Sequence, residues 1–271
     1  MTPAIRLENV CAAYGGAWPQ RSSGRLALDR IALTVPSGSI YGVVGESGSG
    51  KSTLARVLLR LMQPTSGSVA VAGQDPYQLK GRAIAQFRRL IQPVFQDSMA
   101  ALDPRIRVGD SLRMVLDLHA IGHPGDRQRA VEDLLTSVGL DASLCGRFPH
   151  QISGGQRQRV TIARALSISP QILIADEPVS ALDLTVQAQI LDLLSRLCRE
   201  RGMTMLFISH DLGVVRRIAD HVAVMKAGRI VENGPVGEVF ERPAMDYTRM
   251  LLSSVPRVDF ARLSEQAGGR H

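Results

Sequence analysis

The feature that most constrains this chain is a short glycine-rich segment, residues 45–53. It follows the bulky apolar run Ile40–Val44 and precedes apolar positions at helical spacing. Glycines let a backbone wrap closely with its N–H groups turned inward, and a helix N-terminus adds positive potential, so the segment predicts a P-loop that cradles a polyphosphate. Lys51 is expected to reach the β- and γ-phosphates, and Ser52 to ligate Mg²⁺. The predicted phosphate-binding residues are Gly45, Glu46, Ser47, Gly48, Ser49, Gly50, Lys51, Ser52 and Thr53.

Strand and helix patterns alternate along the chain. Ile40–Val44, Ile172–Ala175 and Thr204–Ser209 are short apolar runs, typical of parallel strands that are covered on both faces. Helical spacing is seen in two sets, Leu54, Val57, Leu58, Leu61 and Val186, Ile190, Leu194, Leu197. The predicted fold class is therefore α/β, a P-loop NTPase core with a mostly parallel sheet.

Two regions depart from this alternation. In the first 35 residues, alternating apolar positions flank a polar stretch, 15–25, which predicts an antiparallel hairpin with a long loop. Between residues 96 and 153 the strand pattern is absent, and Val108–His119 and Arg127–Val138 predict two helices joined by a Gly/Pro turn. We therefore expect an N-terminal antiparallel β subdomain and an inserted α-helical subdomain. Beyond about residue 235, two short helical patterns precede a polar tail.

The composition fits a globular protein, with 45% hydrophobic and 21% charged residues among 271. The longest stretch without a charge, Ile31–Gly45, is shorter than the roughly 20 apolar residues that a membrane span needs. We also expect no secretory signal, and hence a cytoplasmic protein. Three separated cysteines indicate reduced structural thiols rather than disulfides or a zinc site. The net charge of +7 is spread without basic runs, which favours a solvated surface over a nucleic-acid face.

Polar residues follow two of the predicted strands. Asp176 and Glu177 come directly after Ile172–Ala175. Asp176 is expected to bind Mg²⁺ and Glu177 to polarise an attacking water, with an N-cap for the next helix as the alternative. His210 follows Thr204–Ser209 at a strand's carboxyl end, where α/β sheets bind ligands. A helix cap or another satisfied polar role is the alternative for His210.

A second glycine-opened helix start lies downstream of the helical region. Ser153, Gly154, Gly155 and Gln156 precede a helical apolar pattern. Because helix N-termini attract anions, these residues form a second candidate anion site. A simple helix cap is the alternative, and only the combination with the P-loop and the acid pair argues against it.

With these motifs together, the chain resembles the nucleotide-binding subunits of ATP-binding cassette (ABC) transporters over nearly its whole length. The resemblance rests on the P-loop, on Asp176-Glu177 and on the signature Ser153–Gln156, which continues as Arg157, Gln158 and Arg159. It implies an ATPase with ATP and Mg²⁺ as cofactors. Such subunits work as head-to-tail pairs, in which Ser153 and Gly155 of one chain close on ATP held by the P-loop of the other.

The resemblance implies roles for four further residues. Tyr14 would stack on adenine, although an ordinary stacking or core role is the alternative for a single aromatic. Gln96 would couple the γ-phosphate and metal site to the membrane subunits. Asp183 would lie in the loop after Ser180, Ala181 and Leu182, and His210 would sense the γ-phosphate.

The resemblance also implies an organisation and a set of partners. An ABC ATPase domain would occupy residues 1–253, with the helical subdomain, 97–152, as its docking surface, and 254–271 would form a polar tail. Partners would be two membrane permease subunits, a second ABC ATPase subunit, identical or homologous, and indirectly an extracytoplasmic solute-binding protein. Nucleic acid is not expected. The chain would then be peripheral, at the cytoplasmic face of the inner membrane.

Two stretches are similar to the branch that imports peptides and nickel. They are Val94–Asp97 with Leu102–Arg105, and Tyr247–Leu252. Two departures limit this match: no cysteine follows Cys198, which argues against an iron–sulfur site, and Asp246 stands where a proline is usual. The cargo therefore stays open among short peptides, nickel and metal chelates.

The function predicted is an ATP-hydrolysing subunit that powers import through separate permeases. The alternative is a soluble ABC-type ATPase acting on DNA or ribosomes, which would normally carry a long coiled-coil insertion or two cassettes. A GTPase would carry an Asn-Lys-x-Asp base reader, and neither Asn9 nor Asn233 belongs to one. A small-molecule kinase would leave Ser153–Gln156 unexplained.

Overall fold

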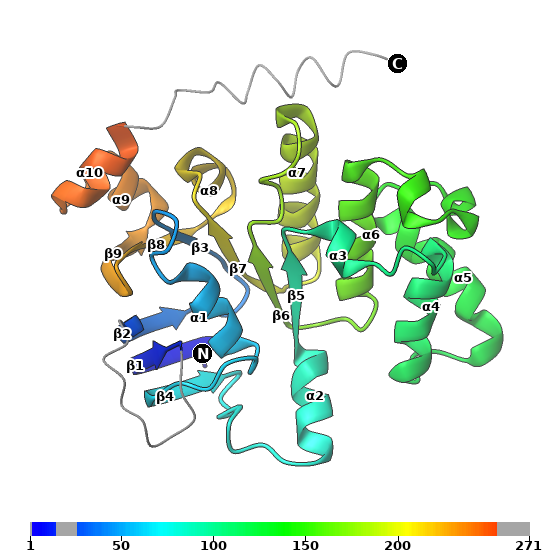
Figure 1. The fold of residues 1–271 in the computed structure, drawn as a ribbon, viewed down its shortest axis with the longest axis horizontal. Helices are drawn as coiled ribbons and strands as arrows, with labels where there is room; N and C mark the ends of the chain where they lie inside the picture. Colours follow the sequence, from blue (N-terminus) through cyan, green and yellow to red (C-terminus); the bar gives the residue numbers. More distant parts are fainter. Residues whose placement is uncertain (1, 15–25, 254–271) are drawn as a thin grey trace.

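The computed structural model describes residues 2–14 and 26–253 and is built around a six-stranded sheet. The strand order is β5-β6-β7-β3-β8-β9 (Figure 1), with all pairs parallel except β8–β9. The strands are β3 (Ile40–Val44), β5 (Ile91–Phe95), β6 (Ile172–Asp176), β7 (Thr204–Ser209), β8 (His221–Lys226) and β9 (Arg229–Pro235). The predicted α/β class with a mostly parallel sheet is confirmed.

A second, antiparallel sheet is formed by the N-terminal part of the chain. Its order is β2-β1-β4, with β1 (Ile5–Ala13), β2 (Leu26–Val35) and β4 (Ser66–Val71). In β1, Ile5 and Leu7 are buried whereas Arg6 and Glu8 are exposed. This alternation is the pattern from which the hairpin was predicted. The predicted hairpin loop, 15–25, lies outside the described residues.

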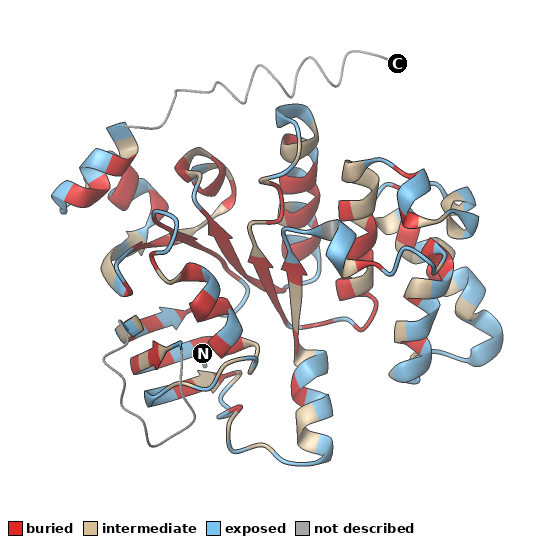
Figure 2. Cartoon of the chain, viewed as in Figure 1, coloured by how far each residue is buried: buried red, intermediate tan, exposed pale blue. Residues whose placement is uncertain are grey.

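The central strands are buried on both faces (Figure 2). Neighbouring residues of one strand belong to different core clusters: Val44 to one and Val43 to the other, and likewise Ala175 and Ile174. Because each face of the sheet is covered, the interior positions of these strands are apolar, and only the end residues Asp176, Thr204 and Ser209 are polar.

Helices supply the cover on each face. The apolar side of α1 (Lys51–Leu58) shares a core cluster with β1 and β2, and the opposite cluster contains the buried sides of α6 (Gly154–Leu166) and α7 (Leu184–Glu200). The remaining helices around the sheet are α2 (Arg82–Leu90), α8 (Leu212–Ile218), α9 (Val236–Glu241) and α10 (Asp246–Ser253). The last two are the short helical patterns expected after residue 235.

Residues 97–152 contain only helical elements in the structure. These are α3 (Ser98–Ala101), α4 (Val108–Leu118) and α5 (Arg127–Ser137), with 3₁₀ turns at Pro124–Asp126, Ala142–Gly146 and Pro149–Gln151. The ends of α4 and α5 agree with the prediction to one residue. Leu112, Leu116 and Leu135 join the core cluster that contains α6, so this helical region packs directly on the rest of the molecule.

Two expectations differ from the structure. Leu61 was expected on the helix that follows the P-loop, but α1 ends at Leu58, Arg60 has a φ of 58°, and Leu61 is 66% exposed. Four strands, β4, β5, β8 and β9, were not predicted. The expected tail, 254–271, lies outside the described residues.

Within residues 2–14 and 26–253, no helix has the length and apolar character to cross a membrane.

Candidate functional site

Residues 45–53 turn from β3 into α1, as predicted. Gly50 precedes the helix with a φ of 107°, and no side chain caps the helix start. A Cβ on Gly50 would lie 2.4 Å from the carbonyl oxygen of Ala27, and one on Gly45 would lie 2.2 Å from that of Met225. The loop can press against β2 and β8 only because these residues are glycines, and the helix start is left without a side-chain acceptor.

Lys51 lies inside the loop, with 5% of its surface exposed. Its Nζ donates to the carbonyl oxygens of Gly45, at 2.7 Å, and Glu46, at 2.9 Å. Burial lowers the pKa of Lys51, while the carboxylates of Glu177 and Asp176 act in the opposite direction. The loop itself therefore accepts two of the three N–H donors of the ammonium group, and the predicted base Glu177 and metal ligand Asp176 lie nearby.

A cavity of about 590 Å³ lies beside the loop, at the carboxyl ends of β5, β6 and β7. The predicted site residues that line it are Ser47, Ser52, Gln96, Asp176, Glu177 and His210. Parallel pairing of the strands brings these distant segments to one edge of the sheet. Phe95 and Asp97 also line the cavity, and they had been noted only as part of a family pattern.

Ser52 and Asp176 form an oxygen-rich corner of this cavity. Ser52 Oγ donates to Asp176 Oδ1 at 3.3 Å. Burial raises the pKa of Asp176, and the Ser52 hydrogen bond opposes this. Hydroxyl and carboxylate oxygens suit Mg²⁺, which commonly takes one or two protein ligands together with substrate phosphates. Within the described ranges, no group of three His, Cys, Asp or Glu residues could hold a metal ion.

Glu177 and His210 face each other in the same cavity. The Nδ1 atom of His210 lies 3.1 Å from Glu177 Oε2, and Glu177 has a φ of 50°. Neither residue caps a helix, because Asp183 caps α7 and Asp211 caps α8. The helix-cap alternatives for Asp176-Glu177 and for His210 are therefore wrong.

An adjoining cavity of about 420 Å³ contains Tyr14. The two cavities share Ser47, Ser52 and Glu177. The Tyr14 hydroxyl lies 2.9 Å from Thr53 Oγ1 and accepts a hydrogen bond from Arg56 at 3.1 Å. Tyr14 is 53% exposed, so the core role considered for it is wrong. The Arg56 guanidinium lies over its ring, 5.9 Å from the centre, so the ordinary stacking role is present in the single chain.

The turn between β8 and β9 is a part of this site that the sequence did not reveal. Ala227 and Gly228 form the turn, with φ angles of 47° and 82°, and both line the smaller cavity. The N–H of Gly228 donates to the carbonyl oxygen of Ser49 at 2.9 Å. Positive φ at both turn residues is a hairpin signal, but no local pattern indicates that this hairpin reaches the P-loop.

The signature residues lie on a different element, at the start of α6. Ser153 Oγ accepts from the N–H of Gln156 at 3.2 Å, and Gln156 Oε1 accepts from the N–H of Ser153 at 2.9 Å. The simple cap considered as an alternative is therefore formed within the chain. Ser153 is exposed, and Gly154 and Gly155 are half-buried, so the turn is accessible from outside.

Asp183 lies beside this turn and does not line either cavity described above. Its Oδ1 accepts from the N–H of Val186 at 2.9 Å. A Cβ on Gly155 would lie 2.6 Å from Val186 Cγ1, and one on Gly154 would lie 3.6 Å from Leu182 Cδ2. In a single chain the predicted nucleotide-binding residues therefore form two groups, one around the P-loop and one around the start of α6.

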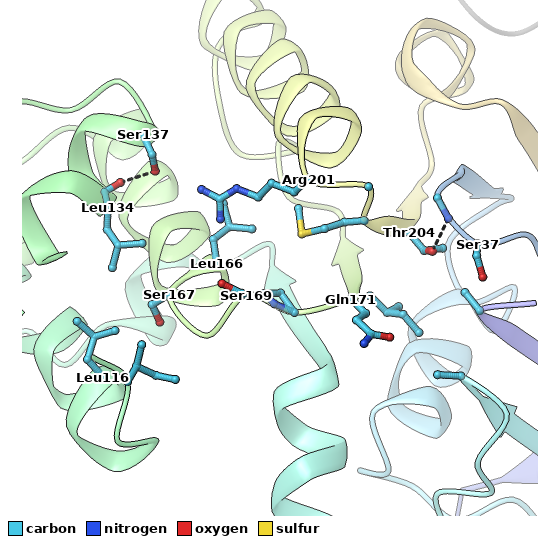
Figure 3. Close-up of a pocket in the computed structure, with 18 of the residues that line it drawn as sticks. Ser37, Leu116, Leu134, Ser137, Leu166, Ser167, Ser169, Gln171, Arg201 and Thr204 are labelled. Carbon is cyan, nitrogen blue, oxygen red and sulfur yellow. Dashed lines mark hydrogen bonds between the residues drawn. The ribbon is translucent and has the colours of Figure 1, made fainter. Parts of the chain in front are cut away.

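A larger cavity of about 1050 Å³ lies at the opposite edge of the sheet, where β6 and β7 begin (Figure 3). Thr204 Oγ1 accepts from the N–H of Gly38, and the hydroxyls of Ser137 and Ser167 donate to backbone carbonyls. These polar groups are thus already paired, and none of the predicted site residues lines the cavity. We assign it to the packing of the helical region against the core rather than to the site.

The fold and the P-loop cavities define a nucleotide-binding protein of the P-loop class. Family comparison gives the same result in finer detail. Residues 28–180 match the ABC transporter family, and residues 231–270 match the family described as the C-terminal region of oligopeptide/dipeptide transporters. The chain belongs to the ABC transporter family and carries its ATPase domain.

Individual relatives agree with this placement. The glutathione import ATP-binding protein GsiA of Pectobacterium atrosepticum is 49% identical over 87% of this chain, which spans 38% of that protein. The oligopeptide transport ATP-binding protein OppF of Streptococcus mutans is 44% identical over 94% of this chain and 82% of its own length.

Solved structures show the same fold. The ATP-binding cassette MJ0796, as a dimer in a post-hydrolysis state bound to ADP and Pi, has a TM-score of 0.74 at 29% identity, covering 86% of this chain and 98% of its own. The cbiO1 protein of Clostridium perfringens, part of the ABC transporter complex cbiONQ, has a TM-score of 0.78 at 28% identity, covering 98% of this chain and 100% of its own.

Proposed function

We propose that the chain is the ATP-binding and ATP-hydrolysing subunit of an importer of short peptides or a related small solute. Peptide and glutathione import in the names of its relatives, and the match of residues 231–270, support this over an ATPase acting on DNA or ribosomes. The same names favour peptides over nickel as cargo. The chain would act at the cytoplasmic face of the inner membrane, with two permease subunits and, indirectly, an extracytoplasmic solute-binding protein.

The observation that carries the mechanism is the separation of the two groups of site residues. The P-loop residues surround the cavities, whereas Ser153–Gln156 and Asp183 present an accessible turn elsewhere. A second copy or a homologous subunit, docked head to tail, would bring that turn to the phosphates. Hydrolysis would then require the pair, and ATP binding would drive its closure.

Within this proposal, each residue near the phosphates has a stated role in binding or hydrolysis. Residues 45–53 hold the phosphates, and Tyr14 stacks on adenine. Ser52, Asp176 and Gln96 hold Mg²⁺, which when bound neutralises charge that develops on the transferred phosphoryl group. Glu177 accepts the proton of the attacking water, and His210, 3.1 Å from it, contacts the γ-phosphate and orients Glu177.

Replacement of the proposed base tests this mechanism. In Glu177→Gln the amide keeps the side-chain shape but cannot accept the proton, so turnover should fall at least about a hundredfold while ATP binding persists. ATP hydrolysis and nucleotide binding are measured on the same preparation. Glu200→Gln, at an exposed ion pair with Arg196, is the matched control. Wild-type turnover in Glu177→Gln would remove Glu177 from its role.

The same variant tests the pairing and the cargo. With Mg²⁺ and ATP, Glu177→Gln should sediment as a dimer, and a persistent monomer would contradict the head-to-tail arrangement. The cargo is tested with the full importer, isolated with the permeases that co-purify with this chain. In vesicles, labelled short peptides should enter in an ATP-dependent manner; uptake of nickel alone would overturn the peptide assignment.

A further inference from the structure

The back of the P-loop is covered by the C-terminal part of the described chain. The turn after β8 contacts the loop directly, because the N–H of Gly228 donates to Ser49 O and the carbonyl oxygen of Met225 faces Gly45. In Figure 1, α9 and α10 lie beside this β8–β9 hairpin. The outer wall of the loop is therefore built by a segment almost 200 residues later in sequence.

Tyr247, in α10, lies where this segment meets the loop. Only 8% of the residue's surface is exposed, and Lys226 Nζ lies 4.4 Å from the centre of its ring. Its buried hydroxyl makes no hydrogen bond of normal geometry within the described residues. Burial raises the pKa of Tyr247, and Glu46, the second residue of the P-loop, has a smaller effect on it.

The start of α10 is fixed by one acidic side chain of β9. Glu232 accepts hydrogen bonds from the N–H groups of Ala244, at 2.7 Å, and Met245, at 3.2 Å, and from the hydroxyl of Thr248. Because β9 pairs with β8, this anchor connects α10 to the hairpin that carries Lys226. The Tyr247 ring is thereby held against Lys226, on the hairpin whose Gly228 contacts the P-loop.

We propose that Tyr247 is a positioning residue for ATP binding: its ring, held against Lys226, fixes the first peptides of the P-loop from behind. Those peptides contact phosphate in the ground state and the transition state alike. Loosening them should therefore weaken nucleotide binding and leave the chemical step nearly unchanged. The proposal depends on the ATPase activity and is independent of the identity of the cargo.

The test separates nucleotide affinity from turnover. In Tyr247→Leu, loss of the ring and its contact with the cation should raise KM for ATP and Kd for ADP about fivefold, with kcat within about twofold of wild type. Tyr247→Phe keeps the ring over Lys226 and should restore both constants. Lys226→Met should raise Kd as well, and its effect should be non-additive with Tyr247→Leu.

Two variants of the same helix serve as controls. Leu251→Ala removes a buried side chain one turn further on and should lower the unfolding midpoint without changing Kd. Met250→Ala alters an exposed side chain and should change neither quantity. An unchanged Kd in Tyr247→Leu, a fall in kcat alone, or the same Kd increase in Leu251→Ala would overturn the proposal.

Discussion

The helix N-termini of α1 and α6 are both opened by glycines, and they differ in how their N–H groups are satisfied. Before α1, Gly50 has a φ of 107° and no side chain caps the helix. Before α6, Ser153 and Gln156 form a reciprocal capping box. The first start lies beside the buried Lys51, whereas the second lies on an exposed turn.

This difference determines which helix start can bind an anion in an isolated chain. An uncapped start flanked by glycines leaves backbone donors for an anion, and Lys51 adds a positive charge. A capped start has already satisfied one of its donors, so an anion there must compete with Ser153 Oγ. The α1 start is therefore expected to bind phosphate alone, and the α6 start only when a second subunit presents it.

Replacement of Gly50, before α1, and of Gly154, before α6, by alanine should give the largest difference in the free energy of unfolding. Gly50→Ala places a methyl group 2.4 Å from a backbone oxygen at positive φ, and should cost about 2 to 4 kcal/mol of unfolding free energy and abolish ATP binding. Gly154→Ala meets nothing closer than 3.6 Å and should change stability by less than about 0.5 kcal/mol. Urea denaturation measures both; equal costs would remove the distinction.

Removal of the Ser153 cap before α6 should have an intermediate effect on the free energy of unfolding. Ser153→Ala leaves the N–H of Gln156 without its acceptor and should destabilise the chain by about 1 kcal/mol. ATP binding by the single chain should be unchanged, because the P-loop is untouched, while ATP-driven pairing should weaken. Urea denaturation, nucleotide titration and sedimentation check the three parts. Loss of ATP binding by the monomer would show that the two helix starts are not independent.

The smallest effect on the free energy of unfolding is expected from Asp176, whose carboxylate lies beside α1. Burial raises the pKa of Asp176, so between its unfolded value near 3.8 and its higher folded value the native state binds more protons. The free energy of unfolding of the nucleotide-free protein should therefore rise as the pH falls through this window. Asp176→Asn should remove that pH dependence, stabilise the protein slightly near neutral pH, and abolish the Mg²⁺-dependent part of ATP stabilisation.

A matched substitution sharpens this last measurement. Asp183→Asn exchanges the same groups at an exposed helix cap, where asparagine serves equally well, and should leave the pH dependence in place. Thermal unfolding across pH, with and without Mg²⁺ and ATP, compares the two variants. A pH dependence that survives in Asp176→Asn would assign it to another group.

Much of the fold could be predicted because some segments carry an unambiguous pattern. β3, β6 and β7 are buried on both faces and are apolar except at the end residues Asp176, Thr204 and Ser209. By contrast, β5 contains Pro93 at a sheet edge, and β4 begins with Ser66-Gly67-Ser68, so neither resembles a strand locally. Leu61 continued the helical spacing, but spacing alone does not detect where a helix ends.

The candidate site likewise contains residues that could be predicted from the sequence and residues that could not. The P-loop, Asp176-Glu177 and the signature follow from residue types at fixed spacing, and the structure gathers Asp176, Glu177 and Ser52 as expected. The contribution of Gly228 and Tyr247 could not be predicted, because Gly228 reaches Ser49 through backbone atoms and Tyr247 contacts Lys226 through its ring face. Such contacts leave no local pattern in a sequence.

The two hydrogen bonds that Lys51 makes to Gly45 and Glu46 hold its ammonium group in place before any nucleotide arrives. They use two of the three N–H donors, so a phosphate oxygen can accept the third without displacing a carbonyl oxygen. The side chain therefore loses little further freedom when a phosphate binds. When product leaves, the same two hydrogen bonds keep the ammonium group in position for the next nucleotide.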